Sequence, residues 1–164
     1  MANTRARLRM TTLYALGQRA RALVAGTGNK IEDFGVGFYT KYGDGGVDLS
    51  PIADLTKTEV FALAAHLGVI DAIQQASPTD GLWGDDRTDE DQLGATYPEL
   101  EWAMSWEAAH AALSDEAREV EEQGLPRRQQ EVLATYRKHH RANKHKMVPI
   151  PVCIIPDEVR QASA

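Results

Sequence analysis

The chain has 164 residues, of which 43% are hydrophobic, and its formal net charge is −6 at pH 7. This length suits one globular domain or part of one, and the acidic balance argues against a general nucleic-acid partner. Because no apolar run approaches a membrane span, no signal-peptide core follows the N-terminus and Cys153 is the only cysteine, we expect a soluble, cytoplasmic protein without membrane partners.

The charges are unevenly placed along the chain. Residues 1–31 carry only basic charges, residues 80–122 are mainly acidic, and residues 127–146 are again basic. Solvated helix faces would account for this pattern. The alternative is that the two basic segments converge on an anionic, phosphate-bearing ligand.

The first predicted elements are a helix and a strand. Residues 4–21 favour an amphipathic helix, because leucines recur at near-helical spacing. Residues 22–25 form a short apolar run that ends in Gly-Thr-Gly-Asn, a pattern typical of a buried strand followed by a loop. Helix, strand and loop in this order favour an α/β fold with a parallel sheet, in which ligands bind at the carboxyl ends of the strands.

The clearest predicted helix follows a glycine-rich loop at residues 41–51. Thr56 and Glu59 have the capping-box spacing, apolar residues follow at helical intervals, and Gly68 stands where a left-handed helix end is expected. Residues 77–100 favour a long loop with short helical pieces. Further helices are predicted over 99–122 and 126–142, while prolines exclude a helix from the tail at 147–152.

Candidate ligand-binding side chains follow the predicted strand. Thr27 could donate a hydrogen bond to a nucleotide, and Glu32 could hold Mg²⁺, which prefers carboxylate oxygen. A simple turn would account for Gly-Thr-Gly as well. Lys57 stands in the first turn of the capped helix, where the helix dipole disfavours a cation, and this indicates an anionic ligand nearby unless the side chain extends into water.

A second group of candidates lies in the glycine-rich loop and near the C-terminus. Three glycines between Lys41 and Asp48 would allow close approach of the backbone to a ligand. A surface loop with a loose ion pair between these two residues is the alternative. His145 and Lys146 precede the proline-rich tail and could meet phosphate or carboxylate, whereas the histidines lack convincing metal-ligand spacing.

Six segments of the chain, in this order, closely resemble NAD synthetases. They are Arg-Leu-Arg-Met at 7–10, Gly-Thr-Gly-Asn-Lys-Ile-Glu at 26–32, Tyr-Thr-Lys-Tyr-Gly-Asp-Gly-Gly-Val-Asp at 39–48, Pro-Ile-Ala-Asp-Leu-Thr-Lys at 51–57, Ser-Pro-Thr at 77–79 and His-Lys-Met at 145–147. The resemblance covers nearly the whole chain. It implies that residues 1–164 are the C-terminal half of an NAD synthetase domain with the N-type ATP pyrophosphatase fold, a Rossmann-like parallel sheet flanked by helices.

The resemblance also implies a reaction and its ligands. Such enzymes activate the carboxylate of deamido-NAD with ATP and Mg²⁺, and ammonia then displaces AMP to give NAD. Matched by position, the resemblance implies ATP contacts at Thr27, Lys57 and Thr79 and a Mg²⁺ ligand at Glu32. The implied deamido-NAD contacts are Arg7, Lys41, Asp48, His145 and Lys146. A homodimer is implied as well, and free ammonia is the expected nitrogen donor because nothing resembles a glutaminase.

One departure from the family concerns the phosphate-binding loop. The family's Ser-Gly-Gly-x-Asp-Ser loop does not occur in this sequence. We therefore expect the N-terminal strands and this loop to be missing, the chain to be inactive alone, and a separate N-terminal half to complete the site. A non-catalytic fragment that binds a dinucleotide or dimerises is the alternative. GMP synthetase and tRNA-thiolating enzymes share the chemistry, but the Lys-Tyr-Gly-Asp-Gly-Gly stretch argues against them.

Overall fold

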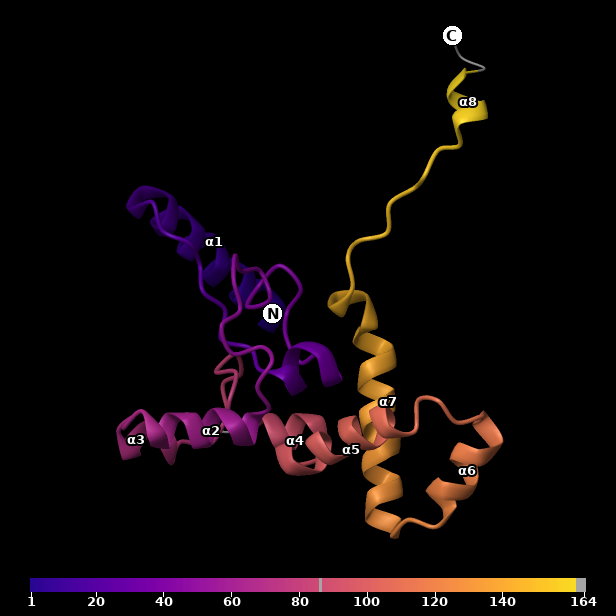
Figure 1. Cartoon of the computed structure of the whole chain (residues 1–164). Helices are drawn as coiled ribbons and strands as arrows, with labels where there is room; N and C mark the ends of the chain where they lie inside the picture. The colour runs from indigo at the N-terminus through magenta and orange to yellow at the C-terminus, as the bar shows by residue number, and fades with distance from the viewer. Residues whose placement is uncertain (86, 162–164) are drawn as a thin grey trace.

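The computed structural model describes residues 1–85 and 87–161, which are mainly helical (Figure 1). The described elements are α1 (Ala2–Ala20), the π-helix η1 (Ile31–Val36), α2 (Lys57–His66), α3 (Asp71–Gln74), α4 (Asp89–Leu93), α5 (Tyr97–Ala109), α6 (Asp115–Gln123), α7 (Arg127–Met147) and α8 (Asp157–Gln161). Within this described part, no helix combines the length and apolar character that a membrane crossing needs.

The predicted parallel sheet is wrong for this chain. The described residues contain one isolated parallel β-bridge, between Ala25 and Leu49, and no extended strand. Backbone hydrogen bonds from Asp48 to Val24 (2.9 Å) and from Gly26 to Leu49 (2.7 Å) flank this bridge. Parallel strands are stable where other strands flank them and helices cover both faces, and the described residues supply neither here. The fold of this chain is therefore helical rather than α/β.

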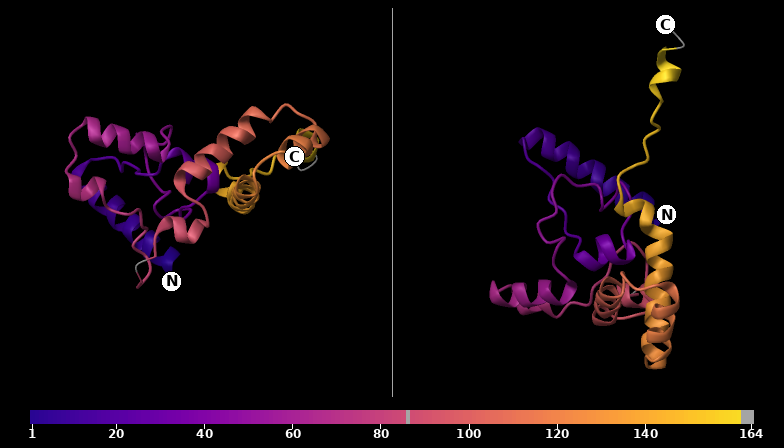
Figure 2. Two further views of the ribbon diagram at one scale, coloured as in Figure 1. Left: turned by 90° about the horizontal axis from the view of Figure 1, so that it is seen from below. Right: turned by 45° about the vertical axis from the view of Figure 1, so that its right-hand side comes forward.

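The hydrophobic core lies where α5 and α7 pack against each other and against η1 (Figures 1 and 2). Leu100 and Ala103 of α5 and Leu133 of α7 are completely buried, and all three stand at helical spacing from other core residues. Ile31 and Val36 anchor the two ends of η1 in the same cluster. This packing fixes η1, and hence Glu32, relative to the long helices.

Capping boxes at Thr56, Thr88 and Thr96 set the starts of the helices nearest the site. The predicted box at Thr56 and Glu59 is confirmed, with the Thr56 backbone N–H donating to the Glu59 carboxylate at 2.7 Å. Gly68 has the predicted left-handed conformation, with φ of +68°. Thr96 and Glu99 form an equivalent box at the start of α5, and the Glu99 carboxylate also accepts two hydrogen bonds from Arg128 of α7 at 2.7 Å.

Replacing Glu99 by Gln is expected to destabilise the fold near neutral pH but not in strong acid. Hydrogen bonds from Arg128, reinforced by those from Thr96, lower the pKa of Glu99 to about 2. The unfolded carboxyl binds its proton more readily, so this stabilisation is present above pH ~4.5 and is lost as pH falls through ~2. After allowance for solvent screening we expect a difference of ~1 kcal/mol at pH 7.

Urea unfolding of both proteins at several pH values, followed by circular dichroism, measures this difference. Glu131→Gln is the matched control, because Glu131 pairs with Arg127 in a far more exposed bridge. A difference between Glu99→Gln and the wild type that stays constant from pH 7 down to pH 2 would contradict the assignment.

The helix boundaries differ from expectation in two places. The single helix predicted over 99–122 is divided into α5 and α6, because Ser114 caps a new helix by accepting a hydrogen bond from the Ala117 backbone. The helix predicted at 126–142 begins after Pro126 but continues to Met147. Basic residues in its last turn suit the negative end of the helix dipole. As a result, His145 and Lys146 lie on α7 rather than between the helix and the tail.

Two predicted helices have apolar faces that the described residues leave uncovered. Leu8, Leu13 and Leu16 of α1 are 64%, 53% and 56% exposed. On α2, Leu63 is 38% exposed, and Leu67 just beyond the helix is 68% exposed. The tail after Val148 is likewise exposed and extends away from the helices (Figure 1; Figure 2, right). The helices are confirmed, but burial of their apolar faces is not.

Candidate functional site

All four residues predicted to bind ATP or Mg²⁺ line one cavity of about 450 Å³. Thr27 follows the β-bridge, Glu32 lies in η1 and Lys57 opens α2. The fourth, Thr79, lies in the loop before α4. Residues of α1 and of the glycine-rich loop form the opposite wall. Segments that are distant in the sequence, namely α1, residues 24–32, the glycine-rich loop, Lys57 and the loop at Thr79, therefore converge on one cavity.

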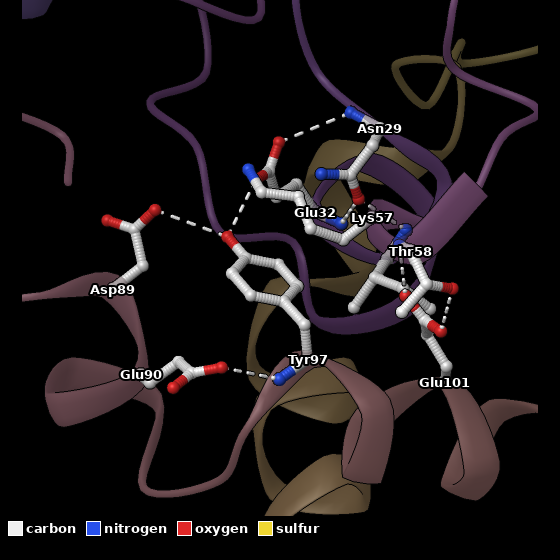
Figure 3. Close-up of polar contacts among 9 residues, drawn as sticks. Asn29, Glu32, Lys57, Thr58, Asp89, Glu90, Tyr97 and Glu101 are labelled. Carbon is white, nitrogen blue, oxygen red and sulfur yellow. Dashed lines mark hydrogen bonds and ion pairs between the residues drawn. The ribbon is translucent and has the colours of Figure 1, made fainter. Parts of the chain in front are cut away.

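Glu32 is the centre of a mostly buried polar cluster at this cavity (Figure 3). The Lys57 Nζ lies 2.9 Å from Glu32 Oε1, and the two side chains are only 19% and 15% exposed. The Tyr97 hydroxyl donates to the same carboxylate oxygen at 2.6 Å. The Asn29 backbone N–H donates to the other oxygen at 3.2 Å. These contacts hold one carboxylate in a defined position facing the predicted nucleotide residues.

Sequence reasoning missed two members of this cluster, Asp89 and Tyr97. Asp89 is only 6% exposed, lines the same cavity and places Oδ2 3.2 Å from the Tyr97 hydroxyl. Burial raises the pKa of both side chains, and the negative charge of Glu32 contributes to each. The one local signal was that each residue directly follows a threonine that caps a helix.

The residues at this cavity fit a hard divalent cation. Within the described part of the chain, no group of three His, Cys, Asp or Glu side chains forms a complete metal site. Mg²⁺, however, is usually held by one or two carboxylates together with water and substrate phosphates. Glu32 and Asp89 provide two carboxylates, and one buried oxygen of Asp89 has no hydrogen-bond partner. An open site of this kind is completed by the substrate.

Three of the predicted deamido-NAD contacts are linked directly to one another. Arg7 of α1 donates through Nε to the backbone carbonyl of Lys41 at 3.3 Å. Lys41 Nζ donates to the carbonyl of His145 on α7 at 2.7 Å. The two basic ends of the chain therefore meet at the glycine-rich loop, and their convergence on an anionic ligand stays a prediction.

Lys146 and Asp48 make different contacts. Lys146 Nζ donates to the carbonyls of Gly37 and Tyr39 at 2.8 and 2.7 Å, and burial lowers its pKa. Asp48 accepts hydrogen bonds from the Tyr14 hydroxyl at 3.0 Å and from the Val24 backbone at 2.8 Å. Among the described contacts, Asp48 does not pair with Lys41. Both residues hold backbone segments together here, and their roles as ligand contacts stay predictions.

A larger cavity of about 590 Å³ lies between α5, α6 and α7. None of the predicted site residues lines it. Part of its charge is paired within the protein, since Arg137 contacts Glu107 and Glu122 at 2.6 Å each. We therefore favour the smaller cavity, where Glu32 and Lys57 meet, as the candidate functional site.

Comparison with known proteins supports the resemblance seen in the sequence. The family model described as NAD synthase matches residues 1–149. The NH(3)-dependent NAD(+) synthetase of Carboxydothermus hydrogenoformans is 46% identical over 115 residues, which are 70% of this chain and 46% of that protein. The NH(3)-dependent NAD(+) synthetase of Syntrophomonas wolfei is 40% identical over 158 residues, which are 96% of this chain and 55% of that protein.

Two solved structures resemble this chain in fold. NMN synthetase from Francisella tularensis superimposes with a TM-score of 0.70 at 31% identity, covering 95% of this chain and 56% of that one. For the NH3-dependent NAD synthetase from Campylobacter jejuni, the TM-score is 0.65 at 23% identity, over 93% of this chain and 54% of that one, which supports the fold alone. This chain spans about half the length of the relatives it matches. With the family model matched over residues 1–149, the chain belongs to the NAD synthase family.

Proposed function

We propose that this chain forms part of an ammonia-dependent NAD synthetase, a carbon–nitrogen ligase that converts deamido-NAD, ATP and ammonia into NAD, AMP and pyrophosphate. The observation that carries the proposal is the convergence of Thr27, Glu32, Lys57 and Thr79 on one cavity. Those residues come from three separate segments, 26–32, 51–57 and 77–79, and the resemblance assigns all of them to ATP or Mg²⁺.

The chemistry explains why two anionic nucleotides must be held together. A carboxylate is a poor electrophile because it is already negatively charged and lacks a good leaving group. Attack of its oxygen on the α-phosphorus of ATP releases pyrophosphate and gives a neutral acyl carbon with AMP as leaving group. Ammonia then attacks that carbon, loses a proton and expels AMP to form the amide. The protein therefore has to align the reactants and neutralise charge on phosphate oxygens.

The described residues can perform these tasks at neighbouring places. At the cavity, Lys57 provides a cation for the phosphates, while Thr27 and Thr79 provide hydroxyl groups for the nucleotide. Mg²⁺, when bound, supplies further positive charge for the pyrophosphate, and Glu32 would hold it. At the glycine-rich loop, Lys41 and His145 meet and would bind deamido-NAD.

Three observations support a second segment that completes the site. The chain matches about half of its relatives' length, and its sequence has no Ser-Gly-Gly-x-Asp-Ser loop. The leucines of α1 are more than half exposed, as an uncovered interface would be. We infer that a polypeptide carrying the phosphate loop packs here, and that the completed protein forms a homodimer.

Complementation tests this proposal directly. The full chain would be mixed or co-expressed with the N-terminal half of the Syntrophomonas wolfei relative, and formation of NAD from deamido-NAD, ATP, Mg²⁺ and ammonia would be measured. We expect NAD formation in the mixture and none from either part alone. A mixture with the double variant Glu32→Gln/Lys57→Met, which removes both charges of the buried pair together, serves as the inactive control. If two folded parts associate but form no NAD, the chain is a non-catalytic fragment that binds a dinucleotide or dimerises.

A second candidate substrate deserves the same assay. The Francisella tularensis protein, which is 31% identical and superimposes over 95% of this chain, is an NMN synthetase. Amidation of the nicotinate mononucleotide would use the same carboxylate chemistry on a smaller substrate. Comparing kcat/KM for the two acids in the complemented enzyme decides between them, and we expect deamido-NAD to be preferred.

A further inference from the structure

Asp89 is a buried carboxylate that the protein itself does not satisfy. The side chain belongs to a residue that is 6% exposed, and its Oδ1 atom is inaccessible and has no hydrogen-bond partner. A buried polar atom without a partner costs free energy, so such atoms are rare in native proteins. The charge of a neighbouring carboxylate, Glu32, makes the arrangement still less favourable in the absence of a ligand.

The second oxygen of Asp89 is only partly satisfied. Among the described residues its one hydrogen bond is to the Tyr97 hydroxyl at 3.2 Å, and that hydroxyl lies much closer, at 2.6 Å, to Glu32 (Figure 3). A phenol has a single proton to donate, and the shorter contact takes it. Two carboxylates therefore contact one hydroxyl oxygen that has a single proton to donate. Lys57 neutralises Glu32 and leaves Asp89 without an ion-pair partner among the described residues.

We propose that Asp89 is a ligand of a divalent cation, and that it forms with Glu32 a two-carboxylate site at the edge of the nucleotide cavity. This inference rests on the proposed function, because it concerns the cation expected there. Both residues line the cavity, and Asp89 opens α4 directly after the loop that carries Thr79. A cation between the carboxylates supplies the positive charge that Asp89 lacks.

Cation binding should also separate the ion pair between Glu32 and Lys57. When the cation binds, it takes over the neutralisation of Glu32. The Lys57 ammonium, now without its carboxylate partner, is free to turn toward phosphate in the same cavity. Before the cation binds, Lys57 neutralises Glu32 in its place. Because cation binding releases Lys57 for the phosphates, binding of the cation favours binding of the nucleotide, and the reverse also holds.

Terbium luminescence tests this site in the full chain without ATP or a second polypeptide. Tb³⁺ is a hard cation with oxygen ligands, and Tyr97 lies close enough to sensitise its emission under ultraviolet excitation. We expect emission that saturates with Tb³⁺ and is displaced by Mg²⁺. Asp89→Asn and Glu32→Gln should each weaken the apparent affinity at least about tenfold. Asp54→Asn, which removes a carboxylate that is 97% exposed and outside the cavity, should leave it unchanged.

Thermal unfolding with and without Mg²⁺ separates a ligand from a structural residue. Asp89→Asn should keep or raise the Tm without Mg²⁺ and should lose the Mg²⁺-dependent rise. Tyr97→Phe, which keeps both carboxylates, should retain that rise. Wild-type Tb³⁺ affinity in Asp89→Asn, an unchanged Mg²⁺ response in that variant, or loss of the response in Tyr97→Phe would overturn the proposal. Since neither measurement involves NAD formation, each outcome is independent of the complementation assay.

Discussion

Replacing Lys57 by Met is expected to lower the free energy of unfolding by about 3–5 kcal/mol. Lys57 pairs with Glu32 at 2.9 Å, and both side chains are more than four-fifths buried. Removal of the lysine leaves a buried carboxylate without its counter-charge, beside a second carboxylate at Asp89. Met retains most of the volume of the lysine stem, so the loss of stability measures the removal of the charge rather than the creation of a cavity.

Lys30→Met is a matched control for this prediction. Lys30 pairs with Asp54 at the same 2.9 Å, but its side chain is 39% exposed and that of Asp54 is 97% exposed. Water screens such a pair, so the expected cost is below ~1 kcal/mol. Urea unfolding of both variants gives the comparison. Combining Glu32→Gln with Lys57→Met should recover most of the loss, and equal costs for the two lysine variants would refute this account.

Replacing Leu133 by Ala is expected to cost about 3–5 kcal/mol of stability. Leu133 of α7 is completely buried in the cluster formed by α5, α7 and η1. Its truncation removes apolar contacts and leaves a cavity that rigid helices on three sides cannot close. A typical domain is stable by only ~5–15 kcal/mol, so the variant should be near the limit of folding.

Leu67→Ala provides the comparison for the core variant. Leu67 follows α2 and is 68% exposed, so the same chemical change there should alter stability by less than ~0.5 kcal/mol. Thermal and urea unfolding of the two variants, both followed by circular dichroism, measure the contrast. A large loss from Leu67→Ala in the isolated chain would show that the α2 face is covered, for instance by a second copy.

Features determined by neighbouring residues could be predicted from the sequence. The capping box at Thr56, the left-handed Gly68 and the helix start after Pro126 depend on side chains within a few positions of one another, and all three are found. The strand at residues 22–25 depends instead on distant partners. Local sequence cannot show whether those partners are present, and the described residues supply one bridge only.

The candidate site likewise combines residues that local motifs identify with residues that only distant contacts bring together. The family motifs identified Thr27, Glu32 and Lys57, and the structure places them at one cavity. Asp89 and Tyr97 were missed because Tyr97 meets Glu32 across 65 positions of the chain, and no local period or motif records such a contact. The first residues of two helices thus contribute side chains to this polar cluster that only the three-dimensional arrangement reveals.

Helix α7 joins the core to the predicted dinucleotide residues without interruption. Its middle is anchored by Leu133 and Tyr136, and its last turn carries His145 and Lys146. Each residue of an α-helix advances the chain by ~1.5 Å and turns it by ~100°. Inserting or deleting one residue between these two parts would rotate both basic side chains to another side of the helix. The length of this segment should therefore be fixed among homologues whose loops vary freely in length.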